Sequence, residues 1–301
     1  MNLDRLKRVT IDKREAFEAA LAVQQRLSCE SNFANIFMWS EVYDTYYTEI
    51  NSRIVVLNLK VAALLFPFGQ WFEPAQLEQH RADLSATMGI DLSWGDVPRE
   101  YIETHAAALC QYYIISTTPD EDDYILSVEN LAELSGRGHQ NTRRLIRQFG
   151  EQVPGWRLIE ITLDNSELAR QFAMAQIEAE RPGDFLDDES LAITRAFNNF
   201  SQLGLEGVLL ISPSGEPQAF SVYSFTRPDT CNVHFEKADR QIRGAAQTIR
   251  VSLAQHLLQR AKWINLEQDL GNPGLRRSKA SYMPEQLLPR YRLSKIAGTE
   301  K

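Results

Sequence analysis

The segment from Val233 to Tyr282 constrains the fold of this chain more than any other stretch. A strand-like run ends in charged residues, and a glycine-containing turn then opens a long amphipathic helix. A second strand-like run, Trp263–Gln268, follows at once and leads into an Asn-Pro-Gly turn and a basic segment. Strand and helix patterns in such close succession predict a mixed α/β fold, with a functional turn between the first strand and the helix.

That turn reads Q-x-x-G-x-A, with Gln241, Gly244 and Ala246 at the fixed positions. A turn of this kind presents bare backbone N–H groups at a helix N-terminus, which suits a phosphate. Gly244 lets the backbone come close to a ligand, Ala246 leaves the approach open, and Arg243 supplies a charge-assisted donor. We predict that Gln241, Arg243, Gly244 and Ala246 bind the phosphate of a donor. The alternative is a glycine that only starts a helix under a tight turn.

The charge of the chain is unevenly distributed. The formal net charge is −8, which argues against binding nucleic acid through the whole surface. Residues 240–295, however, include eleven Lys or Arg and only three acidic residues. A locally basic segment on an acidic protein suits one anionic ligand held in one place; the alternative is a solvated basic helix face.

The order of predicted elements indicates two halves of similar composition. Helices and strands alternate through residues 1–130, a polar and basic connector spans residues 131–155, and residues 156–301 repeat a comparable order. At 301 residues, two domains of ordinary size fit the length. We therefore predict an α/β chain with an N-terminal domain, a connector and a C-terminal domain that carries the turn.

Several classes of protein are disfavoured by the sequence. No run approaches the roughly 18 to 20 apolar residues that cross a bilayer, so we expect no integral membrane segment. The charged N-terminus does not resemble a signal peptide, and three scattered cysteines suggest neither a disulfide framework nor a zinc site. We expect a cytoplasmic protein without a bound metal.

Two groups of polar residues are candidates for the chemistry. His234 and Glu236 lie two positions apart on a predicted strand and are expected to share a face. A carboxylate in a partly apolar cleft can take a proton from an attacking nitrogen, so we predict catalytic roles for both. The alternative for His234 is a structural histidine in a strand.

Asn265, Glu267 and Asp269 alternate on the next predicted strand and are expected to point to one side. Burying three polar groups without partners is costly, so they are candidates for a site: Glu267 as a base, Asn265 and Asp269 as substrate ligands. The alternative is a hydrogen-bonded network that braces the following turn.

Three residues near the C-terminus fall close to one helix face: Arg276, Lys279 and Tyr282. We predict that Arg276 and Lys279 bind an anionic substrate and that Tyr282 is an acid for the leaving group. No Ser-His-Asp order, Cys-His pair or metal-ligand spacing stands out.

The order of elements in the second half resembles the GNAT acyltransferase superfamily. The finer pattern is similar to a bacterial family related to the C-terminal, aminoacyl-transferring domain of phosphatidylglycerol lysyltransferase, which is built as two tandem GNAT-like halves. The residues that carry this resemblance lie in both halves and in the connector: 32–39, 134–139, Arg143, Arg144, 234–239, 244–247, 265–271, Gly274, Leu275, Arg276, Lys279, Ser281 and Tyr282. The connector has arginines where that family usually carries several lysines.

The resemblance implies an acyltransferase with no cofactor beyond its donor. An aminoacyl-tRNA donor follows from the lysyltransferase likeness, and an acyl-CoA donor follows from the Q-x-x-G-x-A turn. The acceptor is an amine or hydroxyl of a small molecule or a lipid, and the oligomeric state is left open. The rival hypothesis is a catalytically inactive GNAT-like module that only binds a ligand.

Overall fold

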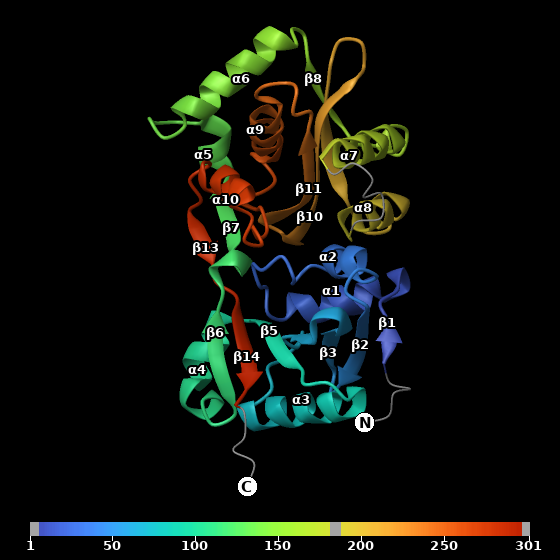
Figure 1. Cartoon of the computed structure of the whole chain (residues 1–301), viewed down its shortest axis with the longest axis vertical. Helices are drawn as coiled ribbons and strands as arrows, with labels where there is room; N and C mark the ends of the chain where they lie inside the picture. The colour runs from blue at the N-terminus through green and yellow to red at the C-terminus, as the bar shows by residue number, and fades with distance from the viewer. Residues whose placement is uncertain (1–5, 181–187, 297–301) are drawn as a thin grey trace. The chain divides into compact units, whose positions relative to one another are not determined.

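Two seven-stranded mixed sheets form the framework of the protein. A computed structural model describes residues 6–180 and 188–296. The chain divides into two units: Met1–Asp123 with Leu288–Lys301, and Tyr124–Leu287 (Figure 1). The first sheet has the strand order β1-β2-β3-β4-β5-β14-β6, and the second has the order β13-β7-β12-β11-β10-β9-β8.

In its described residues, the first unit combines four α-helices with its sheet. Proline at the first helical position and a capping box at Glu73 begin its longest helix, and Gly89 in the left-handed region ends it. The helices are α1 (Arg14–Ala22), α2 (Phe33–Trp39), α3 (Pro74–Met88) and α4 (Arg99–Leu109). The strands are β1 (Lys7–Arg8), β2 (Thr45–Ile50), β3 (Arg53–Asn58), β4 (Ala63–Leu65), β5 (Ser93–Val97), β6 (Tyr113–Thr117) and β14 (Tyr291–Lys295).

The second unit has longer strands. Its helices are α5 (Val128–Glu133), α6 (Gln140–Gln152), α7 (Ser166–Glu180), α8 (Asp188–Asn198), α9 (Ala245–Leu257) and α10 (Pro273–Ala280). Its strands are β7 (Asp123–Ser127), β8 (Arg157–Glu160), β9 (Glu206–Ile211), β10 (Pro217–Arg227), β11 (Thr230–Ala238), β12 (Trp263–Asn265) and β13 (Gln286–Leu288).

Helices cover both faces of the second sheet. Helix α9 is the buried one: its residues pack with α5 and with the strands into one apolar core (Figure 1). On β10 the ring of Phe220 contacts Phe172 of α7 and Phe197 of α8, while its neighbour Ala219 belongs to the core around α9. Successive residues of a strand face opposite sides, so α7 and α8 lie on the face opposite to α9.

The predicted mixed α/β class is confirmed by these two sheets. The structural division differs from the one expected at residues 130 and 156. Strand β7 pairs with β12 in the second sheet, and β14, from the C-terminal end of the described chain, pairs with β5 and β6 in the first. Both sets of pairings join residues far apart in the sequence, so no local sequence pattern predicts them.

The N-terminus of α9 is packed against α6. Gly244 lies there with a φ of 89°, and a Cβ added to it would sit 2.1 Å from the carbonyl oxygen of Leu145. The backbone N–H of Arg243 donates to Oε1 of Gln152, the C-terminal residue of α6, at 3.1 Å. Glycine at 244 is therefore required both by the backbone angle and by the closeness of the two helices.

We expect Gly244→Ala to destabilise the protein more than the backbone angle alone explains. Gly215 is the matched control, because its φ is 88° and a Cβ there would meet nothing within 4 Å. Gly215→Ala should cost about 1 kcal/mol for the strained angle. Gly244→Ala should cost at least about 2 kcal/mol more, since the helices must also separate. Urea denaturation of both variants measures the difference; an equal decrease in stability would contradict the close approach of the helices.

Candidate active site

The parallel pairing of β11 and β12 is short, and the candidate site lies where it ends. The two strands pair over only three positions, Thr230 with Trp263 to Asn232 with Asn265. Strand β11 continues to Ala238, whereas the chain after Asn265 turns away. Glu267 has a φ of 59°, in the left-handed region that residues other than glycine rarely adopt. The predicted strand Trp263–Gln268 is thus cut short, and the expected alternation of Asn265, Glu267 and Asp269 is wrong.

A β-bulge in β11 sets the direction of His234. Val222 of β10 is opposite Phe235 and the next residue, Tyr223, is opposite Val233, so His234 is the extra residue. Bulges often occur beside active sites because they redirect a side chain. His234 contacts Ser224 and Glu267, whereas Glu236 contacts Arg250 of α9. The expectation that His234 and Glu236 share a face is therefore wrong.

The imidazole of His234 connects three segments. Its Nε2 lies 2.8 Å from Oγ of Ser224 on β10, and its Nδ1 lies 3.1 Å from Oε1 of Glu267. The side chain of His234 is fully buried, and that of Glu267 is 16% exposed. The amide nitrogen of Asn232 donates to the same Glu267 oxygen at 2.8 Å. Asn265 accepts the backbone N–H of Glu267 at 2.7 Å and so holds this residue in its unusual conformation.

Glu236 takes part in a separate, buried ion pair on the α9 side of the sheet. Nη2 of Arg250 donates to Oε1 of Glu236 at 2.5 Å, and the guanidinium lies 4.6 Å from the centre of the Tyr282 ring. Burial raises the pKa of Glu236, although Arg250 opposes that effect. Burial also raises the pKa of Tyr282 to about 12. The structure therefore brings Glu236 and Tyr282 together, through an arginine that sequence reasoning did not single out.

Asp269 and Arg276 form a third group. Nε and Nη2 of Arg276 each donate to one carboxylate oxygen of Asp269 at 2.8 Å. The hydroxyl of Tyr124 donates to the same carboxylate at 2.6 Å, and the backbone N–H of Gly271 donates at 2.9 Å. These bonds, led by those from Arg276, lower the pKa of Asp269 to about 2. This geometry matches the alternative of a network that braces the turn.

Lys279 lies on the buried side of α10. Its Nζ donates to the carbonyl oxygens of Leu266 and Gln268, both at 2.5 Å. These two carbonyls flank Glu267, so Lys279 stabilises the segment that carries this carboxylate. The substrate-binding roles predicted for Asn265, Asp269, Arg276 and Lys279 stay predictions, and each of the four has a structural partner.

The predicted phosphate-binding turn is placed at the start of α9, under α6. Gln241, Arg243 and Ala246 are exposed and Gly244 is buried. The N–H of Gln241 donates to Asp239, and that of Arg243 donates to Gln152. Two of the backbone donors that a phosphate would use are thus engaged within the protein. The phosphate-binding role of these four residues remains a prediction.

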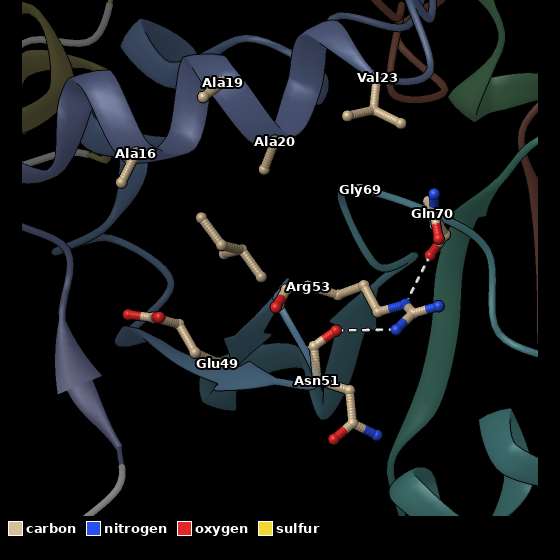
Figure 2. Close-up of a pocket in the computed structure, with 11 residues that line it drawn as sticks. Ala16, Ala19, Ala20, Val23, Glu49, Asn51, Arg53, Gly69 and Gln70 are labelled. Atoms are coloured by element: carbon tan, nitrogen blue, oxygen red, sulfur yellow. Dashed lines mark hydrogen bonds between the residues drawn. The ribbon is translucent and has the colours of Figure 1, made fainter.

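A pocket of about 440 Å³ lies elsewhere, within the first unit (Figure 2). Alanines of α1 form one wall, and Glu49 and Arg53 are its charged groups. The guanidinium of Arg53 is held by the carbonyl oxygens of Asn51 and Gln70, at 2.7 and 2.8 Å. This leaves one exposed carboxylate beside an apolar wall, which is not the acid–base set that acyl transfer needs.

Comparison with known proteins now identifies the family. The family model described as phosphatidylglycerol lysyltransferase, C-terminal, matches residues 22–294. The chain belongs to this family. The resemblance drawn from the sequence is thereby confirmed. No protein of curated function matches the chain significantly.

Solved structures agree with membership of the phosphatidylglycerol lysyltransferase C-terminal family. A conserved protein of unknown function from Bacteroides thetaiotaomicron is 27% identical over 97% of this chain and 99% of its own, with a TM-score of 0.86. The L-PGS of Bacillus licheniformis is 14% identical over 97% and 94%, with a TM-score of 0.67. FemX is 9% identical over 97% and 96%, with a TM-score of 0.57.

Membership of this family supports an aminoacyl or acyl transferase in general. The likenesses to L-PGS and FemX concern the fold alone, and the pair of tandem GNAT-like halves stays a prediction. In the part of the chain that the structure describes, no helix combines the length and the apolar character needed to cross a bilayer. Nor do the described residues place three or more His, Cys, Asp or Glu side chains together as metal ligands would be.

We expect the loss of stability caused by Asp269→Asn to depend on pH, because the variant removes the negative charge that pairs with Arg276. The folded-state pKa of about 2 lies below the ordinary value of 3.8, so the pair stabilises the fold above pH 4 and loses this effect as the pH falls towards 2. The variant should be less stable than the unaltered protein by about 2 kcal/mol at pH 7, and this difference in stability should be smaller at pH 3.

Urea denaturation at the two pH values measures this gap. The exposed Asp164 on the loop before α7 gives the control, Asp164→Asn, which should show little difference at either pH. A gap for Asp269→Asn that does not change with pH would contradict the assignment.

Proposed function

We propose that this protein transfers an aminoacyl group from a phosphate-bearing carrier to an amine or hydroxyl, with His234 and Glu267 as its proton-accepting pair. One observation carries the proposal: a buried histidine is joined to a carboxylate at 3.1 Å where β11 and β12 separate. In acyl transfer the attacking group must lose a proton, and histidine held by a carboxylate is the commonest base for that step.

The partners of the three candidate carboxylates distinguish their roles. Glu236 and Asp269 are each paired with an arginine, which stays protonated at any ordinary pH. Glu267 is paired with histidine, the side chain whose charge ordinarily changes near neutrality. A histidine is the partner best suited to accept and return a proton in a catalytic cycle. We therefore assign Glu236 with Arg250, and Asp269 with Arg276, to holding the site in shape.

The packing of α6 supports an aminoacyl-tRNA donor. A bound acyl-CoA would place its pyrophosphate at the start of α9, where Gly244 is in contact with α6 and the N–H of Arg243 is engaged by Gln152. Helix α6 itself carries three exposed arginines, Arg143, Arg144 and Arg147, and exposed Arg137 precedes it. Such a row suits a phosphate backbone better than a single pyrophosphate.

The acceptor we propose is a hydroxyl of a lipid headgroup, by analogy with the phosphatidylglycerol named in the family description. Small amines are the alternative acceptor. A GNAT-like module that binds a ligand without turnover is the rival, and the transfer assay below separates it from an enzyme.

We expect Glu267→Gln to lower the rate of transfer by about 10²- to 10⁴-fold, because Gln cannot stabilise a protonated His234. The assay follows labelled aminoacyl groups from a charged tRNA pool to phosphatidylglycerol vesicles or to small amines. Glu216→Gln, on the exposed turn between β9 and β10, is the control and should transfer at the original rate. Equal rates for both variants would remove Glu267 from the chemistry, and no transfer by the unaltered protein would favour the binding module.

We expect the double variant Arg144→Gln, Arg147→Gln to bind tRNA less tightly and with a weaker dependence on salt. For each phosphate that the variant no longer binds, the plot of log affinity against log salt should flatten by about 0.7 to 0.9. Arg170→Gln on α7 is the matched control, since Arg170 pairs with Glu167 within its own helix much as Arg147 pairs with Glu151. An unchanged slope in the double variant, or tRNA displaced by coenzyme A, would overturn the placement of the donor on α6.

A further inference from the structure

Ser224, His234 and Glu267 form a continuous relay that no pattern in the sequence disclosed. Oγ of Ser224 lies 2.8 Å from Nε2 of His234, and Nδ1 of the same ring lies 3.1 Å from the Glu267 carboxylate. A hydroxyl, an imidazole and a carboxylate joined in this order are the parts of a serine nucleophile with its base and its orienting acid. Such relays are recognised by geometry and not by order in the chain.

The surroundings of His234 fix which nitrogen carries the proton. An ionised Glu267 carboxylate accepts only, so Nδ1 must be the donor towards it. The amide nitrogen of Asn232, 3.1 Å from Nδ1, then donates to Oε1 of Glu267 and not to the ring. Nε2 is left as the acceptor, and the hydroxyl of Ser224 is the donor that reaches it. The proton that His234 removes first is therefore the proton of Ser224.

We propose that Ser224 is the nucleophile of this protein and that the acyl group passes through a covalent ester on its Oγ. The proposal rests on the acyl-transfer function proposed above. In the first step Oγ bonds to the acyl carbonyl carbon and the bond from that carbon to the carrier oxygen breaks. The proton of Ser224 moves to Nε2 of His234 and then to the departing carrier oxygen. In the second step the acceptor attacks the Ser224 ester, gives its proton to Nε2, and Ser224 recovers it as it leaves.

The fold holds the three groups rigidly for this task. Ser224 lies on the strand next to the bulge that directs His234, and Asn265 and Lys279 hold the segment of Glu267. Ser224 is 5% exposed and the His234 side chain is fully buried, so bulk water has little access to an ester formed there. A buried ester would survive long enough to meet an acceptor.

An activated ester tests the nucleophile without any knowledge of the natural donor. The protein is mixed with p-nitrophenyl acetate, the release of p-nitrophenol is followed, and the acetylated residue is mapped by mass spectrometry. The unaltered protein should give a burst of one p-nitrophenol per chain and a single acetyl group on Ser224. Ser224→Ala should lose both.

Ser221→Ala is the matched control on the same strand. Ser221 is fully buried, and among the described residues none hydrogen-bonds its hydroxyl, so its removal should leave the burst and the acetylation unchanged. Thermal denaturation of both variants shows that each is folded. Absence of acetylation in the unaltered protein, acetylation at another residue, or a burst that persists in Ser224→Ala would each overturn the proposal.

The transfer assay separates failure of this inference from failure of the proposed function. Transfer by Ser224→Ala at the original rate, with transfer abolished in Glu267→Gln, would overturn the serine ester and leave the base in place. Acetylation of Ser224 without transfer from any charged tRNA would support the nucleophile and overturn the proposed donor.

Discussion

The early end of the pairing between β11 and β12 determines the candidate site. A parallel pair that continued would satisfy the backbone groups of residues 266–268 within the sheet. Here other partners replace the missing ladder: Asn265 accepts the N–H of Glu267, and Lys279 donates to the carbonyls on either side of it. Buried backbone groups need such partners, so the polar residues around the end of this pairing are first of all a structural requirement. That requirement places Glu267 within reach of His234.

The three candidate carboxylates lie within this one unit, and each is stabilised differently. Arginines hold Glu236 and Asp269, and removing either arginine would leave a carboxylate without its counter-charge in a poorly solvated place. His234 holds Glu267 and reaches Ser224 with its other nitrogen. The ion pairs with arginine keep the unit in shape, and the histidine–carboxylate pair lies next to the hydroxyl of Ser224. This division of roles follows from the partners and not from the carboxylates themselves.

The sequence predicts much of this architecture because hydrophobic period and turn residues are local. The alternation of helices and strands predicted through residues 1–130 is present in the structure, for example in strand β3 (Arg53–Asn58) and helix α3 (Pro74–Met88). Strand β5 has a weaker local pattern, since Gly95 and Asp96 interrupt it. The polar residues around Glu267 are also found, because polar side chains in a strand between apolar segments are conspicuous.

The directions of the candidate side chains are beyond prediction. The bulge at His234 depends on how β10 is aligned with β11, and the φ of Glu267 depends on where β12 stops pairing. Ser224 carries no signal at all, because one serine in an apolar strand looks like any other. Gly244 fits both a phosphate-binding turn and a close helix contact, and only the position of Leu145 in space reveals the contact.

The nitrogen-15 spectrum of His234 tests the central claim most directly. The chain has five histidines, and a His234→Gln variant assigns the signal. If Glu267 orients the ring towards Ser224, neutral His234 carries its proton on Nδ1, and Glu267→Gln weakens that preference. A neutral ring protonated on Nε2 in the unaltered protein would contradict the account, because such a ring could not take a proton from Ser224.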